Sequence, residues 1–169
     1  TKADKFTHLL RYKNDSLMIS YKTLNNDNPK LNCRLNGVKK YSPKRIILDS
    51  KLNTNINSFI IKTANKSNTI IFYNKAGNSQ ILSFKKKGIN LIRSKIDNKG
   101  RFDIKIILKK LYKLNCRNLL VEGGDELTNY LLRNKIFNTF YLYKSDKKLS
   151  KKTEYLNFNS LNLLKQKYK

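Results

Sequence analysis

Short apolar runs alternate with amphipathic segments along this chain, and the pattern predicts its secondary structure. Apolar runs that suit strands occupy residues 16–20, 44–48, 68–73, 89–92, 119–121 and 138–143. Apolar residues at three- and four-residue intervals predict the end of a helix over residues 2–11, a helix over residues 103–114 and a helix that starts after Gly124. Because solidly apolar strands alternate with helices, we expect an α/β domain with a mostly parallel sheet covered on both faces.

The segments between these elements are polar. The Asn, Asp and Pro cluster in residues 21–34 predicts a loop that cannot continue as regular structure. Pro29 forces Asn28 to be extended, so we expect residues 30–34 to form an extended arm across the surface. The remaining segments are predicted as a loop at residues 37–43, a turn at 77–80 and an ambiguous stretch at 53–62.

The stretch around Glu122 carries the clearest chemical signal. An apolar strand ends in this carboxylate, Gly123 and Gly124 follow directly, and a helix begins. Glycines allow a sharp bend and close approach of a ligand to the backbone, and the amides of a first helical turn attract phosphate. Ligands of parallel sheets bind at the carboxyl ends of strands, and polar residues follow three predicted strands, at 20–23, 49–50 and 122–124. We therefore predict a nucleotide or phosphate site with a carboxylate aimed into it.

The amino-acid composition limits the classes of protein to which this chain can belong. The 169 residues, 39% of them apolar, predict one soluble domain, and no apolar run is long enough to span a bilayer. The charge of +26 would favour a polyanionic partner such as nucleic acid. However, only 7 of the 37 basic residues are Arg, and the lysines are spread along the chain beside 23 Asn. This pattern indicates codon bias and a diffusely basic surface, so we do not expect nucleic-acid binding as the main function.

Several kinds of site are not predicted. The P-loop, the GxGxxG turn and the HxE and CxxC deaminase signature are absent from the sequence. Cys33 and Cys116 form no CxxC pair, so neither a structural zinc site nor a disulfide framework is expected, and a reducing cytoplasm fits best. His8 could serve as an acid or base, but a lone histidine on a helix is more often partly buried and hydrogen-bonded. GGDEL at residues 123–127 differs by one residue from the GGDEF cyclase motif, but the helical spacing after it argues against that family.

Five motifs, in order, resemble the reductase domain of the bifunctional riboflavin-biosynthesis deaminase-reductase. They are THLLRYKND, SLMISYKTLNNDNPKLNCR, PKRIILDS, NLLVEGGDELTNYLL and FNTFYLY, and the match covers about residues 2–143. The resemblance implies a dihydrofolate-reductase-like fold and NADPH as cofactor. It implies reduction of the ribosyl group of 5-amino-6-(5-phosphoribosylamino)uracil to the ribityl form. It also implies a homodimer formed near residues 138–143.

The resemblance also implies which residues form the site. Substrate contacts fall on Arg11, Leu31, Arg34 and Glu122, and the two arginines suit a sugar phosphate by charge and fork geometry. Hydride would pass from C4 of the nicotinamide to C1′ of the ring-opened ribose, with Glu122 orienting the substrate and mediating protonation; the alternatives for Glu122 are a helix cap or a surface carboxylate. NADP contacts fall on Thr23, Asp27, Ser50, Gly124, Asp125, Glu126, Leu127 and Thr128.

The sequence departs from the family at several points. The family's first strand, its SxW segment and its deaminase half would precede Thr1, and further strands would follow Lys169, so we expect residues 1–169 to be an incomplete single reductase domain, truncated at both ends. Asp125 adds a negative charge beside the expected pyrophosphate, and it could instead cap the helix. The alternative functions are a basic nucleic-acid-binding protein without catalysis and a reductase of the same fold that acts on another pyrimidine or a pterin.

Overall fold

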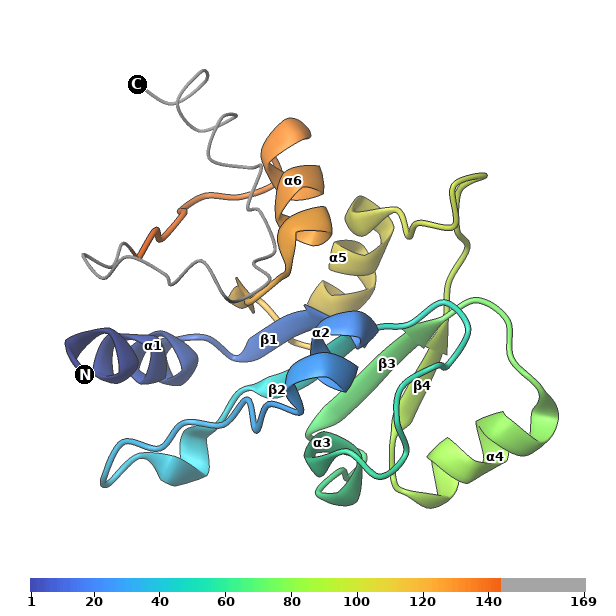
Figure 1. Ribbon diagram of the computed structural model, residues 1–169, viewed down its shortest axis with the longest axis horizontal. Coiled ribbons are helices and arrows are strands. Elements are labelled where there is room, and N and C mark those ends of the chain that lie inside the picture. The colour runs from blue at the N-terminus through green and yellow to red at the C-terminus, as the bar shows by residue number, and fades with distance from the viewer. Residues whose placement is uncertain (144–169) are drawn as a thin grey trace, which may run out of the picture. The chain divides into compact units, whose positions relative to one another are not determined.

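The computed structural model describes residues 1–143, which contain five strands and six α-helices (Figure 1). The chain divides into two compact units, Thr1–Glu122 and Gly123–Lys169. The first unit holds the whole sheet and helices α1 to α5, and the described part of the second holds α6 (Asp125–Arg133). The expected single domain over residues 1–169 stays a prediction, because residues 144–169 lie outside the described part.

The five strands form one parallel sheet in the order β4-β3-β2-β1-β5. Ser16 at the start of β1 pairs with Lys44 of β2 on one side and Leu119 of β5 on the other. Since all strands run the same way, their carboxyl ends meet at one edge, and the prediction of an α/β fold with a parallel sheet is confirmed. The strands are β1 (Ser16–Ser20), β2 (Lys44–Leu48), β3 (Thr69–Tyr73), β4 (Asn90–Arg93) and β5 (Leu119–Val121).

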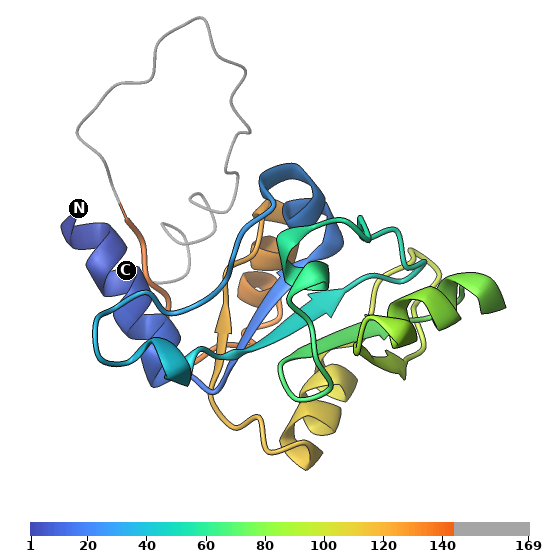
Figure 2. The same ribbon diagram turned by 90° about the horizontal axis from the view of Figure 1, so that it is seen from below.

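Helices cover both faces of this sheet. From β1 to β4, each new strand is added on the same side of the previous one, whereas β5 is added on the other side of β1. Because crossovers between parallel strands are right-handed, α2, α3 and α4 lie on one face of the sheet and α5 lies on the other. Figure 2 shows α2 and α3 on the face opposite α5. Leu17 and Ile19 of β1 belong to the core cluster that also contains Leu24 of α2 and Phe84 of α4. The helices are α1 (Lys2–Lys13), α2 (Tyr21–Asp27), α3 (Phe59–Lys62), α4 (Asn78–Lys86) and α5 (Ile104–Lys113), with a 3-10 turn η1 (Lys39–Tyr41).

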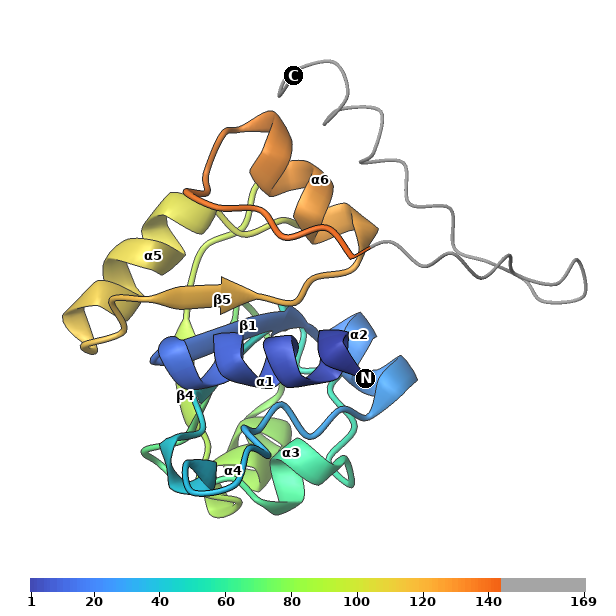
Figure 3. The same cartoon turned by 90° about the vertical axis from the view of Figure 1, so that its left-hand side faces the viewer.

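Helix α1 runs beside β1 in the opposite direction (Figure 3). It begins with a capping box, in which the Thr1 hydroxyl accepts from the Asp4 amide and the Asp4 carboxylate accepts from Thr1. His8 is buried on this helix, and Arg11 lies three residues later on the same face. The predicted helix over residues 2–11 is confirmed and extends to Lys13.

Several predictions for the connecting segments are wrong. Asn28 is not extended before Pro29 but has a φ of 41° and a ψ of 52°, because it is the left-handed C-cap of α2. Two of the segments also contain helices. The Ser20 hydroxyl caps α2 by accepting from the Thr23 amide, and Leu24 anchors that helix in the core. The predicted turn at residues 77–80 is the start of α4, which Phe84 anchors in the same way. Each helix has one buried apolar anchor, so its sequence lacks the apolar stripe on which the prediction relied.

Other differences concern the arm and the last predicted strand. Residues 30–34 are irregular as expected, but Leu31 and Cys33 are buried, so the arm packs into the molecule instead of crossing its surface. The predicted strand at residues 138–143 does not form in the described part of the chain, because apolar alternation yields a strand only where a hydrogen-bonded neighbour is present. The ambiguous stretch at residues 53–62 ends in α3, and β4 is shifted by one residue from its predicted position.

Candidate active site

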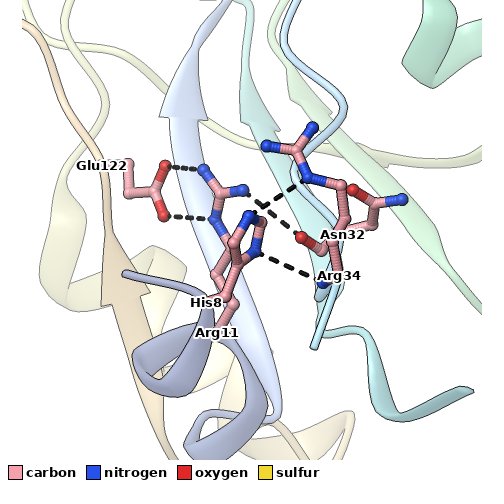
Figure 4. A network of polar contacts seen from close by, with 5 residues as sticks. All are labelled: His8, Arg11, Asn32, Arg34 and Glu122. Carbon is pink, nitrogen blue, oxygen red and sulfur yellow. Dashed lines mark hydrogen bonds and ion pairs between the residues drawn. The ribbon is translucent and has the colours of Figure 1, made fainter. Parts of the chain in front are cut away.

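Arg11 and Glu122 form a bidentate ion pair at the carboxyl edge of the sheet (Figure 4). Arg11 comes from the last turn of α1, and Glu122 follows β5 directly. The Arg11 Nε and Nη2 atoms donate to Glu122 Oε1 and Oε2, each at 2.7 Å. The side chains are 12% and 26% exposed, so the pair is partly screened from water and holds the carboxylate in one orientation. This geometry differs from a helix cap, because Glu122 pairs with a side chain and not with backbone amides.

The third nitrogen of the Arg11 guanidinium is also engaged. Its Nη1 atom donates to the Asn32 carbonyl at 3.3 Å. All three guanidinium nitrogens therefore have partners within the protein. In this arrangement Arg11 fixes Glu122 and does not present its fork to a ligand.

Arg34 differs from Arg11, because its side chain is exposed and only the Nε edge of its guanidinium contacts another side chain. Its backbone amide lies 3.3 Å from His8 Nδ1 and its Nε atom lies 3.1 Å from His8 Nε2, and an uncharged imidazole accepts from one of the two (Figure 4). The two terminal nitrogens of Arg34 make no hydrogen bond or ion pair within residues 1–143. Arg34 thus offers a cationic fork to the solvent, which is the geometry that a phosphate or carboxylate ligand requires.

His8 lies between the two arginines. Burial lowers the pKa of its imidazole, and the positive charges of Arg11 and Arg34 lower it further, while the Asn32 carbonyl and Asp4 oppose the shift. His8 is therefore uncharged at neutral pH. The prediction of a buried, hydrogen-bonded histidine is confirmed.

Residues 31–33 lie beside the network formed by His8, Arg11, Arg34 and Glu122. Leu31, a predicted substrate contact, is 2% exposed and has a φ of 50°, so its side chain belongs to the core. Asn32 Oδ1 is buried, and no hydrogen-bond donor in the described part of the chain reaches it. The Cys33 thiol lies 3.5 Å from the His8 carbonyl. This segment ties the arm to α1.

The predicted cofactor residues of the first unit follow two neighbouring parallel strands. Ser20, which caps α2 and contacts the Thr23 hydroxyl at 3.1 Å, lies opposite Leu48, two residues before Ser50. The Ser50 carbonyl accepts from the amides of Asn74 and Lys75. The structure thus places Thr23 and Ser50 at adjacent strand ends, while Asp27 ends α2 and is exposed.

A buried carboxylate supports the turn that contains Ser50. Asp49 is fully buried, and its two oxygens accept from the Asn53 amide and from the amide and hydroxyl of Thr54, at 2.7 to 2.9 Å. These bonds close the loop that follows β2, and Leu52 within the loop has a φ of 56°. The backbone around Ser50 is therefore held from both sides.

The predicted cofactor residues of the second unit lie at the start of α6. Gly124 is the N-cap, and its carbonyl accepts from the Thr128 amide. A Cβ at Gly123 would lie 3.2 Å from the Leu127 side chain, so any larger residue there would crowd Leu127. Asp125 does not cap the helix as the sequence had allowed; its carboxylate accepts from Asn129 Nδ2 at 2.8 Å.

Two residues of the network were not predicted as site residues. They are His8, which was expected to be structural, and Asn32. The spacing of His8 and Arg11 was the available signal, since residues three apart share a helix face. Asn32 contributes through its carbonyl, which no sequence pattern singles out.

Comparison with known proteins identifies the family. Residues 1–149 match the family model of the RibD C-terminal domain. The chain belongs to this family. The riboflavin biosynthesis protein RibD of Actinobacillus pleuropneumoniae is 31% identical over 137 residues, which cover 81% of this chain and 36% of that protein. The 2,5-diamino-6-ribosylamino-4(3H)-pyrimidinone 5′-phosphate reductase of Debaryomyces hansenii is 32% identical over 145 residues, covering 75% and 56%.

The fold agrees with this membership. The structure of RibD from Acinetobacter baumannii, form 2, superposes with a TM-score of 0.66 at 17% identity, covering 91% of this chain and 43% of that one. The predicted dihydrofolate-reductase-like fold is confirmed. The chain spans 36% and 56% of the two relatives named above.

Within residues 1–143, no helix has the length and apolar character needed to cross a membrane. The same residues contain no group of three or more His, Cys, Asp or Glu side chains placed to hold a metal ion.

Proposed function

We propose that this chain is the reductase part of a riboflavin-biosynthesis enzyme and reduces the ribosyl group of 5-amino-6-(5-phosphoribosylamino)uracil to the ribityl form. The observation that carries the proposal is the network of Arg34, His8, Arg11 and Glu122, which places an open cationic fork near a fixed carboxylate. The names of the relatives support the substrate class, since one of them is a pyrimidinone 5′-phosphate reductase.

Arg34 binds the 5′-phosphate in this proposal. Its terminal nitrogens are the part of the network that is open to a ligand within the described residues, and a planar guanidinium donates two parallel hydrogen bonds to a phosphate. Arg11 contributes to the positive potential, but three of its five N–H groups already donate within the protein. We therefore propose Arg34 as the main phosphate contact, with Arg11 in support.

Glu122 orients the sugar in this proposal. Each oxygen of an ionised carboxylate has two lone pairs, and Arg11 uses one on each oxygen. The remaining lone pairs can accept hydrogen bonds from ribose hydroxyls. Because an ionised carboxylate is only an acceptor, this ion pair favours the orienting role for Glu122 over proton transfer.

NADPH is the proposed cofactor, and it supplies a hydride when bound. Thr23, Asp27 and Ser50 are the cofactor contacts that we propose in the first unit. Residues 124–128 of the second unit are proposed as contacts from the family resemblance. The glycine turn and the first turn of α6 fit a phosphate group by their backbone. Asp125 and Glu126 add negative charge to that turn, so the phosphate contact there relies on backbone amides and not on side chains.

The first test replaces Glu122 with Gln in the protein at its full natural length. We expect the loss of the ion pair to lower kcat/KM for NADPH oxidation with this substrate by about 100-fold, since small misplacements of a substrate cost rates of this order. Loss of reduced-nicotinamide absorbance measures the rate.

Asp97→Asn is the matched control, because Asp97 also pairs with an arginine, Arg101, but on the exposed surface. It should retain wild-type turnover. A Glu122→Gln variant as active as the control would remove Glu122 from the site, and a wild-type protein without turnover would refute the proposed function.

We further propose that the intact protein is a homodimer whose interface includes residues 138–143. Three large side chains there, Tyr141, Leu142 and Tyr143, are 43 to 49% exposed. Clustered exposed apolar side chains are typical of protein interfaces.

A further inference from the structure

His8 is enclosed by groups that donate hydrogen bonds. The Arg34 Nε atom and the Arg34 backbone amide, both donors, face its two ring nitrogens at 3.1 and 3.3 Å. The Asn32 carbonyl accepts from Arg11, and it favours the protonated imidazole. In Figure 4 both ring contacts of His8 go to Arg34, and Arg11 reaches Asn32.

The protonation state of His8 decides whether these contacts attract or repel. An uncharged imidazole has one acceptor nitrogen and one N–H, so it can accept from one of the two Arg34 donors. A protonated imidazole has two N–H groups and no acceptor. Both of its nitrogens would then meet donors of Arg34, whichever nitrogen held the first proton.

We propose that His8 is a positioning residue for the substrate phosphate: as an uncharged acceptor it holds the Nε edge of Arg34 and directs the terminal nitrogens of Arg34 towards the ligand. This inference rests on the proposed function only in naming the ligand as a sugar phosphate. The role of His8 is to restrict Arg34, since a free arginine side chain loses rotamer entropy when a ligand orders it.

The charged groups near His8 favour the uncharged imidazole that this role requires. Arg11 on the same helix and Arg34 on the arm disfavour protonation, and Asp4, one turn earlier on α1, favours it. The two nearby cations outnumber the single carboxylate, and the imidazole is buried. The acceptor state therefore persists below the ordinary histidine pKa of about 6.5.

The experiment measures equilibrium binding of ribose 5-phosphate and of ribose by calorimetry, with the protein at its full natural length. His8→Phe keeps a ring but removes the acceptor, and His8→Gln keeps one acceptor. We expect His8→Phe to weaken ribose 5-phosphate binding about tenfold, as expected for losing one hydrogen bond to a charged group. Ribose binding should not change, and His8→Gln should restore part of the affinity.

A second arm separates positioning from general damage to the fold. In an Arg34→Ala background, His8→Phe should cost nothing further, because the group that it positions is absent. Lys5→Gln, an exposed change on the same helix, is the control and should bind like the wild type. Affinity for ribose 5-phosphate should also fall in acid for the wild type as His8 protonates, and this added loss should be missing in His8→Phe.

The outcomes distinguish the two proposals. Equal losses from His8→Phe with and without Arg34, or equal losses for ribose and ribose 5-phosphate, would overturn the positioning role. A protein that binds ribose 5-phosphate in the expected His8-dependent way but oxidises no NADPH with the proposed substrate would keep the role of His8 and refute the proposed function.

Discussion

Arg11 and Arg34 are equivalent by residue type but differ in what surrounds them. The Arg11 guanidinium donates to Glu122 and to the Asn32 carbonyl, whereas the Arg34 guanidinium contacts His8 through its Nε edge. A guanidinium whose three nitrogens all donate within the protein acts mainly as a structural part of the site. The same group with free terminal nitrogens acts as a receptor for an anion.

Arg11→Lys should therefore destabilise the protein although it keeps the charge. An ammonium cannot donate two parallel bonds to both Glu122 oxygens, so at least one bond to a charged group is lost. We expect a loss of about 1.5 kcal/mol in the free energy of unfolding, measured by urea denaturation.

Arg101→Lys is the control for this change. Arg101 pairs with Asp97 at 3.2 Å, but the two side chains are 43% and 45% exposed. Exposed pairs contribute about 0.2–1 kcal/mol, so this variant should lose clearly less stability than Arg11→Lys. Equal losses would mean that the Arg11 pair is no more than a surface contact.

The sequence could indicate these residues only in part. The family motifs pointed to Arg11, Arg34 and Glu122, but the ion pair joins residues that are 111 positions apart, and no local pattern predicts such a contact. His8 was recognised as a buried, hydrogen-bonded residue. The contact between His8 and Arg34 depends on how residues 30–34 pack against α1. The polar composition of that arm did not predict this packing.

At the level of elements, the presence of an apolar stripe separates the helices that were predicted from those that were missed. Helix α5 was predicted within one residue at each end because a strong apolar stripe follows Asp103. Helices α2 and α4 were missed because each buries a single apolar side chain, Leu24 or Phe84. Strands were easier to predict, since each is a short, nearly continuous apolar run bounded by polar residues.

The cap of α5 gives a test at this level. The Asp103 carboxylate accepts from the Lys105 and Ile106 amides at 2.8 and 3.3 Å. Asp103→Ala should lower the free energy of unfolding by about 1 kcal/mol, as thermal or urea denaturation would measure. Asp103→Asn retains a capping oxygen and should cost much less; equal effects would show that charge, and not the cap, supports the helix.

At the level of the whole molecule, the proposed dimer can be tested through its exposed apolar side chains. Leu142→Asp should weaken self-association at least tenfold, because it introduces a charge into an apolar contact. Sedimentation equilibrium over a range of protein concentrations measures the change. Leu82→Asp is the control, since Leu82 is 56% exposed on α4 and is not among residues 138–143. A wild-type protein that is monomeric at all concentrations would rule the dimer out.

The position of β1 in the sheet has a consequence for how the chain is made. β1 can pair with β2 as soon as residue 48 has left the ribosome, but its other edge waits for β5, more than 100 residues further along the chain. Until then the nascent chain carries an open strand edge, which invites pairing with other chains. Glu122 follows β5 directly, so the carboxylate of the site arrives together with the strand that closes this gap. A nascent chain halted before residue 119 would thus lack both the closing strand and the anchor for Arg11.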